Sequence, residues 1–146
     1  MRLTKQADYS LRILIYLAVY PDRLSRIEEI SRAYDISVFH VGKIVHKLGQ
    51  KGFASVQRGR NGGIKLGNSP DAINLSDVIR EFEPDFNLVE CFNPEQDACS
   101  LTSACKLKGI LGEALTAFDN VLKSYTLADL IKGRKPARYR KSLEEI

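Results

Sequence analysis

The sequence lacks any long run of apolar residues. It begins with "MRLTKQADYS", which is polar, and the next ten residues, "LRILIYLAVY", include a charge and are far fewer than a membrane span requires. The N-terminal segment also lacks the form of a secretory signal peptide. These absences argue against a membrane protein and predict a cytoplasmic one, in which thiols stay reduced.

Sequence signatures of enzymes are missing as well. The chain has no phosphate-binding loop, no nucleophile-and-base pattern and, at 146 residues, no separate substrate domain. An iron cluster with an open coordination position can act as a Lewis acid in a lyase, which makes an enzyme the alternative from another class. Nothing else in the chain supports that alternative, so we expect a protein that is not an enzyme.

Cysteine is scarce, but the three cysteines are close together. Cys91, Cys99 and Cys105 lie in "ECFNPEQDACSLTSAC", with seven and then five residues between them. An odd count leaves one thiol over in any intramolecular disulfide framework, and the usual zinc spacing with a downstream histidine is absent. The stretch is too polar for buried core cysteines. Three thiolates with an open fourth position favour a metal or iron-sulfur site, with zinc or a thiol switch as alternatives.

Charge is unevenly distributed along the chain. Residues 1–66 contain 12 Lys and Arg against 5 Asp and Glu, whereas residues 67–131 contain 4 against 11. Residues 132–146 are basic again, with 6 against 2. A basic half in a small cytoplasmic protein indicates nucleic acid as a partner, and a solvated basic surface is the alternative.

The first fifty residues have the helical period of apolar positions. The pattern predicts three helices, over residues 5–20, 25–34 and 38–52. Thr4 and Ser37 are the expected N-caps of the first and third helices. Ser25 with Glu28 fits a capping box for the second. The last two helices are short and are joined by the tight turn "YDIS", which is typical of a helix-turn-helix.

The next segment predicts a wing. It reads "FASVQRGRNGGIKLG", two short alternating runs around a turn rich in glycine, which is typical of a β-hairpin. We therefore expect a mainly α fold with a small β-hairpin, a winged helix-turn-helix that binds DNA. The expected DNA contacts lie on the third helix and in the wing: Ser37, Val38, Phe39, His40, Lys43, His46, Lys47, Arg58, Arg60, Asn61, Gly62 and Lys65.

Two groups of these residues have different expected roles. Val38, Phe39, His40 and Lys43 would meet base edges in the major groove, and the basic residues of the wing would hold the backbone or the adjacent minor groove. Val38 or Phe39 would contact a thymine methyl group or, alternatively, pack in the domain core.

The rest of the chain predicts a long exposed helix. A short helix fits "NLSDVIREFEP", and a wide apolar stripe runs from Leu107 to Tyr125, before one more turn capped by Thr126. The stripe favours packing against the domain and against a second copy, with an intramolecular core helix as the alternative. The expected organisation is a winged-helix domain over residues 1–67, a cluster-binding loop and dimerisation helix over 68–132, and a basic flexible tail over 133–146.

Four features in this order resemble a known family. They are "MRLTKQADYSLRILIYLA", "RGRNGGIKLG", "INLSDVIREFE" and three cysteines before a long helix. Together they resemble the bacterial iron-sulfur winged-helix repressors that include NsrR, IscR and RirA, over residues 1–132. The resemblance implies a cytoplasmic bacterial homodimer that binds double-stranded, palindromic promoter DNA, with each cluster held near the dimer interface.

The fourth cluster ligand distinguishes the members of this family. IscR-like members use a histidine after the last cysteine to hold a 2Fe-2S cluster, and Lys108 stands at that place here. NsrR-type members, which sense nitric oxide, hold a 4Fe-4S cluster with three cysteines and an aspartate from the first helix of the partner. Asp8 stands at the matching place.

The resemblance therefore implies that Cys91, Cys99, Cys105 and Asp8 of the partner subunit hold the cluster. The implied cluster is 4Fe-4S, with 2Fe-2S as the alternative, and its nitrosylation would release the DNA. A RirA-like iron sensor is the alternative function, because the cysteine spacing suits it too. For Asp8 the alternative is a surface carboxylate favoured by the helix dipole.

Overall fold

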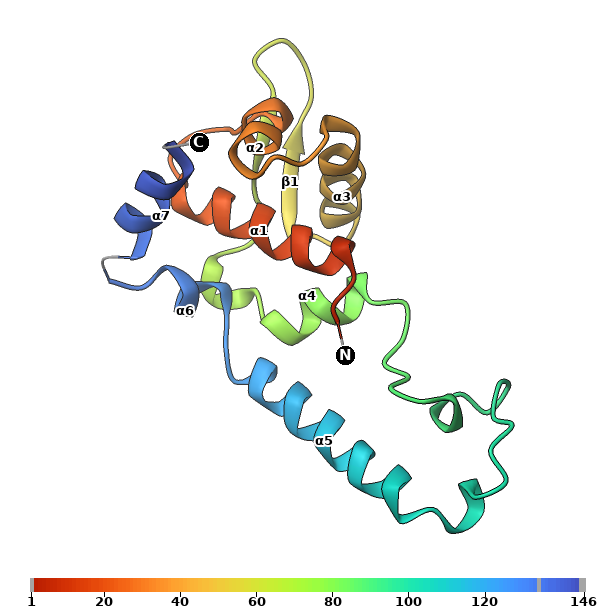
Figure 1. Cartoon of the computed structure of the whole chain (residues 1–146). Helices are drawn as coiled ribbons and strands as arrows, with labels where there is room; N and C mark the ends of the chain where they lie inside the picture. Colours follow the sequence, from red (N-terminus) through yellow and green to blue (C-terminus); the bar gives the residue numbers. More distant parts are fainter. Residues whose placement is uncertain (1, 134, 145–146) are drawn as a thin grey trace.

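The computed structural model describes residues 2–133 and 135–144, and it has the mainly helical fold with one hairpin that the sequence predicts (Figure 1). The helices and strands are α1 (Lys5–Val19), α2 (Ile27–Tyr34), α3 (Val38–Gln50), β1 (Ala54–Gln57), β2 (Gly63–Leu66), α4 (Leu75–Phe82), α5 (Lys106–Lys123), α6 (Leu127–Ile131) and α7 (Lys135–Glu144). Three short 3-10 turns connect them, at Pro70–Ala72, Glu90–Phe92 and Thr102–Ala104.

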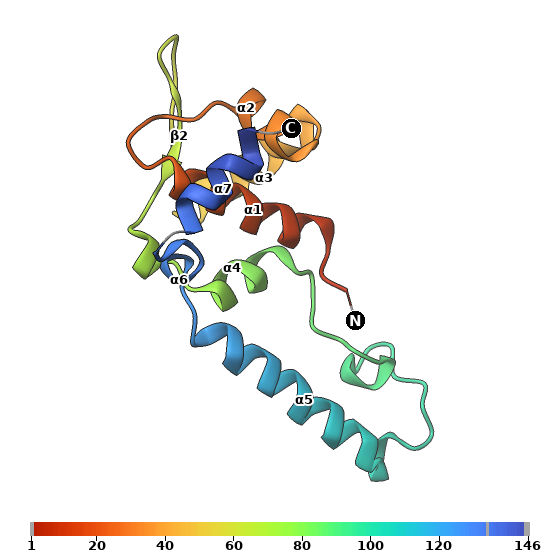
Figure 2. The ribbon, with the colours of Figure 1, turned by 60° about the vertical axis from the view of Figure 1, so that its left-hand side comes forward.

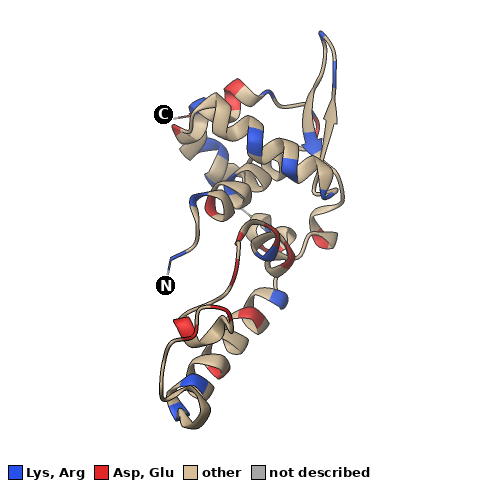
Figure 3. Cartoon of the chain, turned by 90° about the vertical axis from the view of Figure 1, so that its right-hand side faces the viewer, with Lys and Arg blue, Asp and Glu red and all other residues tan. Residues whose placement is uncertain are grey.

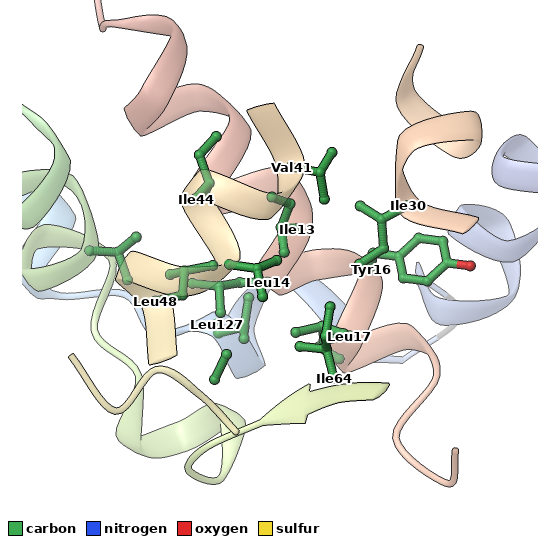
Figure 4. Packing of buried hydrophobic residues seen from close by; sticks show 14 of the residues in the cluster. Ile13, Leu14, Tyr16, Leu17, Ile30, Val41, Ile44, Leu48, Ile64 and Leu127 are labelled. Carbon is green, nitrogen blue, oxygen red and sulfur yellow. The ribbon is translucent and has the colours of Figure 1, made fainter. Parts of the chain in front are cut away.

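Helix α1 is the centre of the hydrophobic core. Its residues Ile13, Leu14 and Leu17 are fully or almost fully buried. Helices α2, α3, α4, α6 and α7 and strand β2 all contact α1. The close view in Figure 4 shows the side chains that meet there: Ile13, Leu14, Tyr16 and Leu17 from α1, Ile30 from α2, Val41, Ile44 and Leu48 from α3, Ile64 from β2 and Leu127 from α6.

Three of the four predicted helix caps are present, and one of them is Thr126, which is the N-cap residue of α6 and forms a capping box with Asp129. The Thr4 side chain accepts a hydrogen bond from the Ala7 backbone N–H, and the Ser37 side chain accepts one from the His40 N–H. The capping box expected at Ser25 is wrong, because Arg26 is the N-cap residue of α2. The backbone of Ser25 instead exchanges two hydrogen bonds with Ile64 in β2, of 2.8 and 2.9 Å. These two bonds fix the base of the wing to the start of α2.

The hairpin is an antiparallel pair in which Ala54 faces Leu66 and Gln57 faces Gly63. Its tight turn requires glycine at position 62, where a Cβ atom would lie 2.2 Å from the Gln57 carbonyl oxygen. The turned view in Figure 2 shows the wing projecting well away from the helices. Residues 58–62 at its tip are therefore available to a partner.

Helix α5 is fastened at one end. The Asn74 amide donates hydrogen bonds to the backbone oxygens of Lys123 (2.7 Å) and Tyr125 (3.2 Å), just after α5 ends. Figures 1 and 2 both show α5 extending away from the winged-helix part toward the cysteine loop. The structure describes all of α5, and none of its residues is buried. The intramolecular core helix is thus excluded for this chain.

The C-terminal segment forms helix α7, where the sequence predicts a flexible tail over residues 133–146. The Arg140 guanidinium donates two hydrogen bonds to the Val19 carbonyl oxygen, of 2.7 and 3.1 Å, and lies over the Tyr20 ring. Leu143 packs against the core. The last carbonyl groups of a helix lack internal partners, so a basic side chain there is stabilising. The sequence gives no sign of this contact because its partners are 121 residues apart.

We predict that Leu14→Ala lowers the free energy of unfolding by about 2–5 kcal/mol, because it leaves a cavity at a fully buried position. Chemical denaturation followed by circular dichroism measures this at a fixed protein concentration. Val56→Ala on β1 is the control, since Val56 is 49% exposed and its truncation should cost far less. Equal losses in the two variants would contradict a core centred on α1.

Candidate nucleic-acid interface and cysteine loop

Helix α3 has one buried and one exposed face. Val41, Ile44, Val45 and Leu48 pack inward, as the sequence predicts. Val38 is 48% and Phe39 is 68% exposed, so neither belongs to the core. His40, Lys43 and His46 are exposed on the same outer side. The second helix of this helix-turn-helix therefore presents apolar and basic side chains to solvent together.

The exposed residues at the start of α3 contact one another. The Lys43 ammonium lies 5.0 Å from the centroid of the Phe39 ring, and the His40 ring meets that ring edge-on at 5.9 Å. The Ser37 hydroxyl lies 2.8 Å from His40 Nδ1 and accepts from the His40 backbone N–H. An exposed aromatic ring held beside two basic side chains suits a base edge with a methyl group, next to a phosphate.

Lys47 has a different environment from the rest of the predicted contacts. Its ammonium donates to the Glu81 backbone oxygen, lies 3.5 Å from the Glu81 carboxylate and 4.7 Å from the Phe82 ring centroid. Lys51 forms a 3.0 Å ion pair with the same carboxylate. The charge of Lys47 is thus already paired within the chain, where it joins α3 to α4.

Three residues of α1 that the sequence analysis missed border the reading face of α3. Lys5, Gln6 and Tyr9 line one concave surface together with residues 35–40 and with Lys43 and His46. The helical period of the sequence could have indicated them, because all three lie outside the apolar stripe of α1. A DNA backbone bound at α3 would therefore also contact these three residues of α1.

The wing adds a second basic element. Arg58, Arg60 and Asn61 are exposed at its tip, and Lys65 is exposed on β2. Figure 3 shows Lys and Arg along the helices and the hairpin of the winged-helix part, and Asp and Glu along the segment that leads to the cysteine loop. The reading helix and the wing therefore carry the positive charge that a nucleic acid requires.

The cysteines lie in a loop between α4 and α5. Cys91 is in the 3-10 turn Glu90–Phe92, the Cys99 N–H donates to the Asp97 carboxylate at 3.1 Å, and Cys105 is the N-cap residue of α5. All three thiols are free and half-buried. Within the described residues, no three His, Cys, Asp or Glu side chains form a group that could hold a metal ion. The single chain thus places the three thiols in one loop without bringing them to one point.

Asp8 lies apart from these cysteines in the single chain. It is in the first turn of α1, 43% exposed, and both of its carboxylate oxygens contact the Arg12 guanidinium, at 2.7 and 3.1 Å. Lys108 is half-buried on α5. Chemically, three thiols with a carboxylate are suitable iron ligands, because soft thiolates favour iron-sulfur clusters.

A helix-turn-helix with an exposed reading helix and a basic wing defines a winged-helix DNA-binding protein. Residues 3–133 match the family Rrf2, described as an iron-dependent transcriptional regulator, and the chain belongs to this family. The family is one of transcriptional regulators and not of enzymes. In the part of the chain that the structure describes, no helix has the length and apolar character to cross a membrane.

Individual relatives support the same assignment. The chain is 47% identical to the HTH-type transcriptional regulator NsrR of Bacillus subtilis, over 92% of this chain and 93% of that protein. It is 48% identical to NsrR of Bacillus licheniformis, over 94% and 97%. The solved structure of CymR, the global cysteine regulator of B. subtilis, superposes with a TM-score of 0.72 at 28% identity, over 89% and 95%. These matches confirm the NsrR-type resemblance and the winged-helix fold.

We predict that Arg60→Gln weakens binding to all DNA sequences and lowers the slope of log K against log salt by about 1, the contribution of one phosphate contact. Fluorescence anisotropy at several salt concentrations measures the slope. Arg138→Gln is the matched control, because Arg138 is exposed on α7 and outside this surface. If both variants keep the wild-type slope, the wing tip does not contact the backbone.

A separate prediction concerns Phe39. If its ring reads a thymine methyl group, replacing single thymines of a bound promoter by uracil weakens wild-type binding at one position of each half-site. Phe39→Ala should bind the thymine-containing promoter more weakly, by about 1 kcal/mol for one buried methyl contact. It should also be insensitive to the uracil replacement. The measurement is a set of competition titrations with uracil-substituted duplexes. A variant that keeps the full sensitivity would rule out this role of Phe39.

Proposed function

We propose that the protein is an iron-sulfur-dependent transcriptional repressor that senses nitric oxide. In this proposal a cluster-loaded homodimer binds palindromic double-stranded promoter DNA in the bacterial cytoplasm, and nitrosylation of the cluster releases it. The observation that carries the proposal is the set of three free thiols in the loop that leads directly into α5, next to a winged-helix reading head. Identity of 47% to an NsrR regulator over almost the whole chain supports it.

The surface of α5 supports the homodimer. Leu107, Ile110 and Val121 are each 58–59% exposed. Apolar residues on the same helix, Leu111, Leu115 and Phe118, line an open pocket against residues 83–89. An apolar helix that projects from a small domain is typical of a subunit interface. A two-fold dimer would also present two reading helices to the two halves of a palindrome.

The proposed cluster ligands are Cys91, Cys99, Cys105 and Asp8 of the partner subunit. Within the described residues of one chain, Asp8 forms no group with two of the cysteines that could hold a metal ion, which is consistent with a ligand set shared between subunits. We propose a 4Fe-4S cluster, with 2Fe-2S as the alternative. When bound, such a cluster supplies an iron that nitric oxide can reach, since a carboxylate is a weaker ligand for iron than a thiolate.

Contacts of α1 would link the state of the cluster to the DNA-binding surface. Asp8 lies on α1, which contacts α3 and the rest of the core. The N-cap of the same helix is tied to the segment before the cysteines, because the Thr4 N–H donates to the Glu83 carboxylate at 2.7 Å. Holding or releasing Asp8 would therefore bias the position of α1 and of the reading head that packs against it.

An iron-responsive repressor is the second candidate. The description of the family as iron-dependent favours it, and its ligand set would be the same. The two functions differ in what removes the cluster. A zinc protein or a thiol switch differs from both, because it would contain no iron.

The test is anaerobic purification followed by visible absorbance and native mass, before and after nitric oxide or an iron chelator, with promoter binding measured in parallel. A 4Fe-4S mass, with cluster and DNA binding both lost at low nitric oxide and little effect of mild chelation, is the expected result. Ready loss to the chelator without a stronger effect of nitric oxide supports the iron sensor. Absence of iron contradicts both.

We predict that Asp8→Asn gives a folded dimer whose cluster is less stable or responds differently to nitric oxide, because one ligand is lost. Asp22→Asn removes the same charge from the exposed turn after α1 and should behave as wild type. Cluster lifetime under chelator, followed by absorbance, is the measurement. Wild-type lifetime and response in Asp8→Asn would exclude Asp8 as a ligand.

A further inference from the structure

Asp119 is the centre of a polar cluster between α5 and α4. Its side chain is only 13% exposed. It accepts from the Ser76 hydroxyl at 2.6 Å and from the Arg80 guanidinium at 2.6 and 3.0 Å, and it forms a 2.8 Å ion pair with Lys123. The hydrogen bonds from Arg80, Lys123 and Ser76 hold the pKa of Asp119 well below its usual range, so it stays charged at neutral pH.

The next residue of α4 after Arg80 carries a second cluster. Glu81 pairs with Lys47 of α3 at 3.5 Å and with Lys51, the C-cap residue of α3, at 3.0 Å. The contact with Lys51 lowers the pKa of Glu81, so this cluster is also charged at neutral pH. One turn of α4 is therefore tied to α5 through Arg80 and to the reading helix through Glu81.

The same turn also contacts the loop that contains the cysteines. The Arg80 guanidinium lies 5.5 Å from the Phe86 ring centroid, in the segment that leads to Cys91. On its other side, α4 buries Val78, Ile79 and Phe82 in the core. Half-exposed ion pairs contribute little to stability. Because the Asp119 and Glu81 ion pairs lie on both sides of α4, they are better suited to fixing the position of α4 than to stabilising the fold.

We propose that Asp119 is a positioning residue that couples the cysteine loop and α5 to the DNA-reading helix through α4. In this arrangement Asp119 fixes α4 to α5 through Arg80 and Ser76, and Glu81 transfers the position of α4 to Lys47 and Lys51 at the C-terminal end of α3. Asp119 contacts neither the proposed cluster ligands nor the DNA-binding surface. The inference rests on the proposed function, because it concerns how the state of the loop reaches the DNA.

The experiment measures promoter affinity of the cluster-loaded and cluster-stripped protein, for the wild type and each variant. Asp119→Asn should reduce the ratio of the two affinities by at least about fivefold, the lower end of typical coupling between two sites. Cluster content and native dimer mass should not change. Arg80→Gln breaks the same link from α4 and should give the same loss of ratio, which covers the case that Asp119→Asn folds poorly.

Glu113→Gln is the matched control, since Glu113 is an exposed acidic residue on the same helix, and it should keep the wild-type ratio. If the wild type itself binds equally with and without its cluster, the proposed function fails and the inference fails with it. If the wild type shows a ratio that Asp119→Asn and Arg80→Gln both keep at equal cluster content, the function stands and the positioning role is overturned.

Discussion

The burial of the apolar face of α1 is the constraint on which the other elements depend. Leu14 and Leu17 lie at the point where α2, α3, β2 and α6 converge. A domain of this size has one core, and here that core is built around a single helix. The reading helix α3 and the wing therefore cannot move independently of α1. Any ligand that binds at the exposed end of α1 acts on the same body that holds the DNA-binding surface.

Outside this core, polar contacts join α5 to α4. Helix α5 contacts the rest of the chain chiefly through α4, by the Asp119 cluster and by the Asn74 hydrogen bonds that follow its last turn. The structure thus has a packed reading head and a projecting arm, joined through a helix of eight residues. A close-packed core moves as one unit when one of its helices is displaced. Elements that are joined by polar contacts can adopt a small number of alternative arrangements.

Local signals predicted most of the fold. The apolar periods of α1, α3 and α5, the caps Thr4 and Ser37 and the glycine-rich turn of the wing each depend on residues a few positions apart. The contacts that the sequence does not indicate are those made with a distant partner. Arg140 docks α7 on α1, and Glu81 pairs with Lys47, which still lines the concave surface of α3. Neither partner is adjacent in sequence, so no periodicity reveals it.

The candidate site also has one part that local sequence signals predict and one part that they do not. Exposure of Phe39, His40 and Lys43 follows from helical phase, and the structure shows it. Convergence of the three thiols does not follow from their spacing, because the loop that holds them has no regular period. The single chain leaves them dispersed, and the resemblance remains the basis for grouping them with Asp8 of the partner subunit.

The attachment of α5 at only one end has a mechanical consequence. An α-helix of 18 residues is about 27 Å long, so a rotation of about 10° at the Asn74 end moves the Cys105 end by about 5 Å. The converse holds when the far ends are clamped together in a pair of subunits: a shift of a few ångströms there turns each reading head by several degrees. In the proposed homodimer, two reading heads on one face of a duplex would have to match a fixed helical repeat, so the length and angle of α5 would set the distance between them.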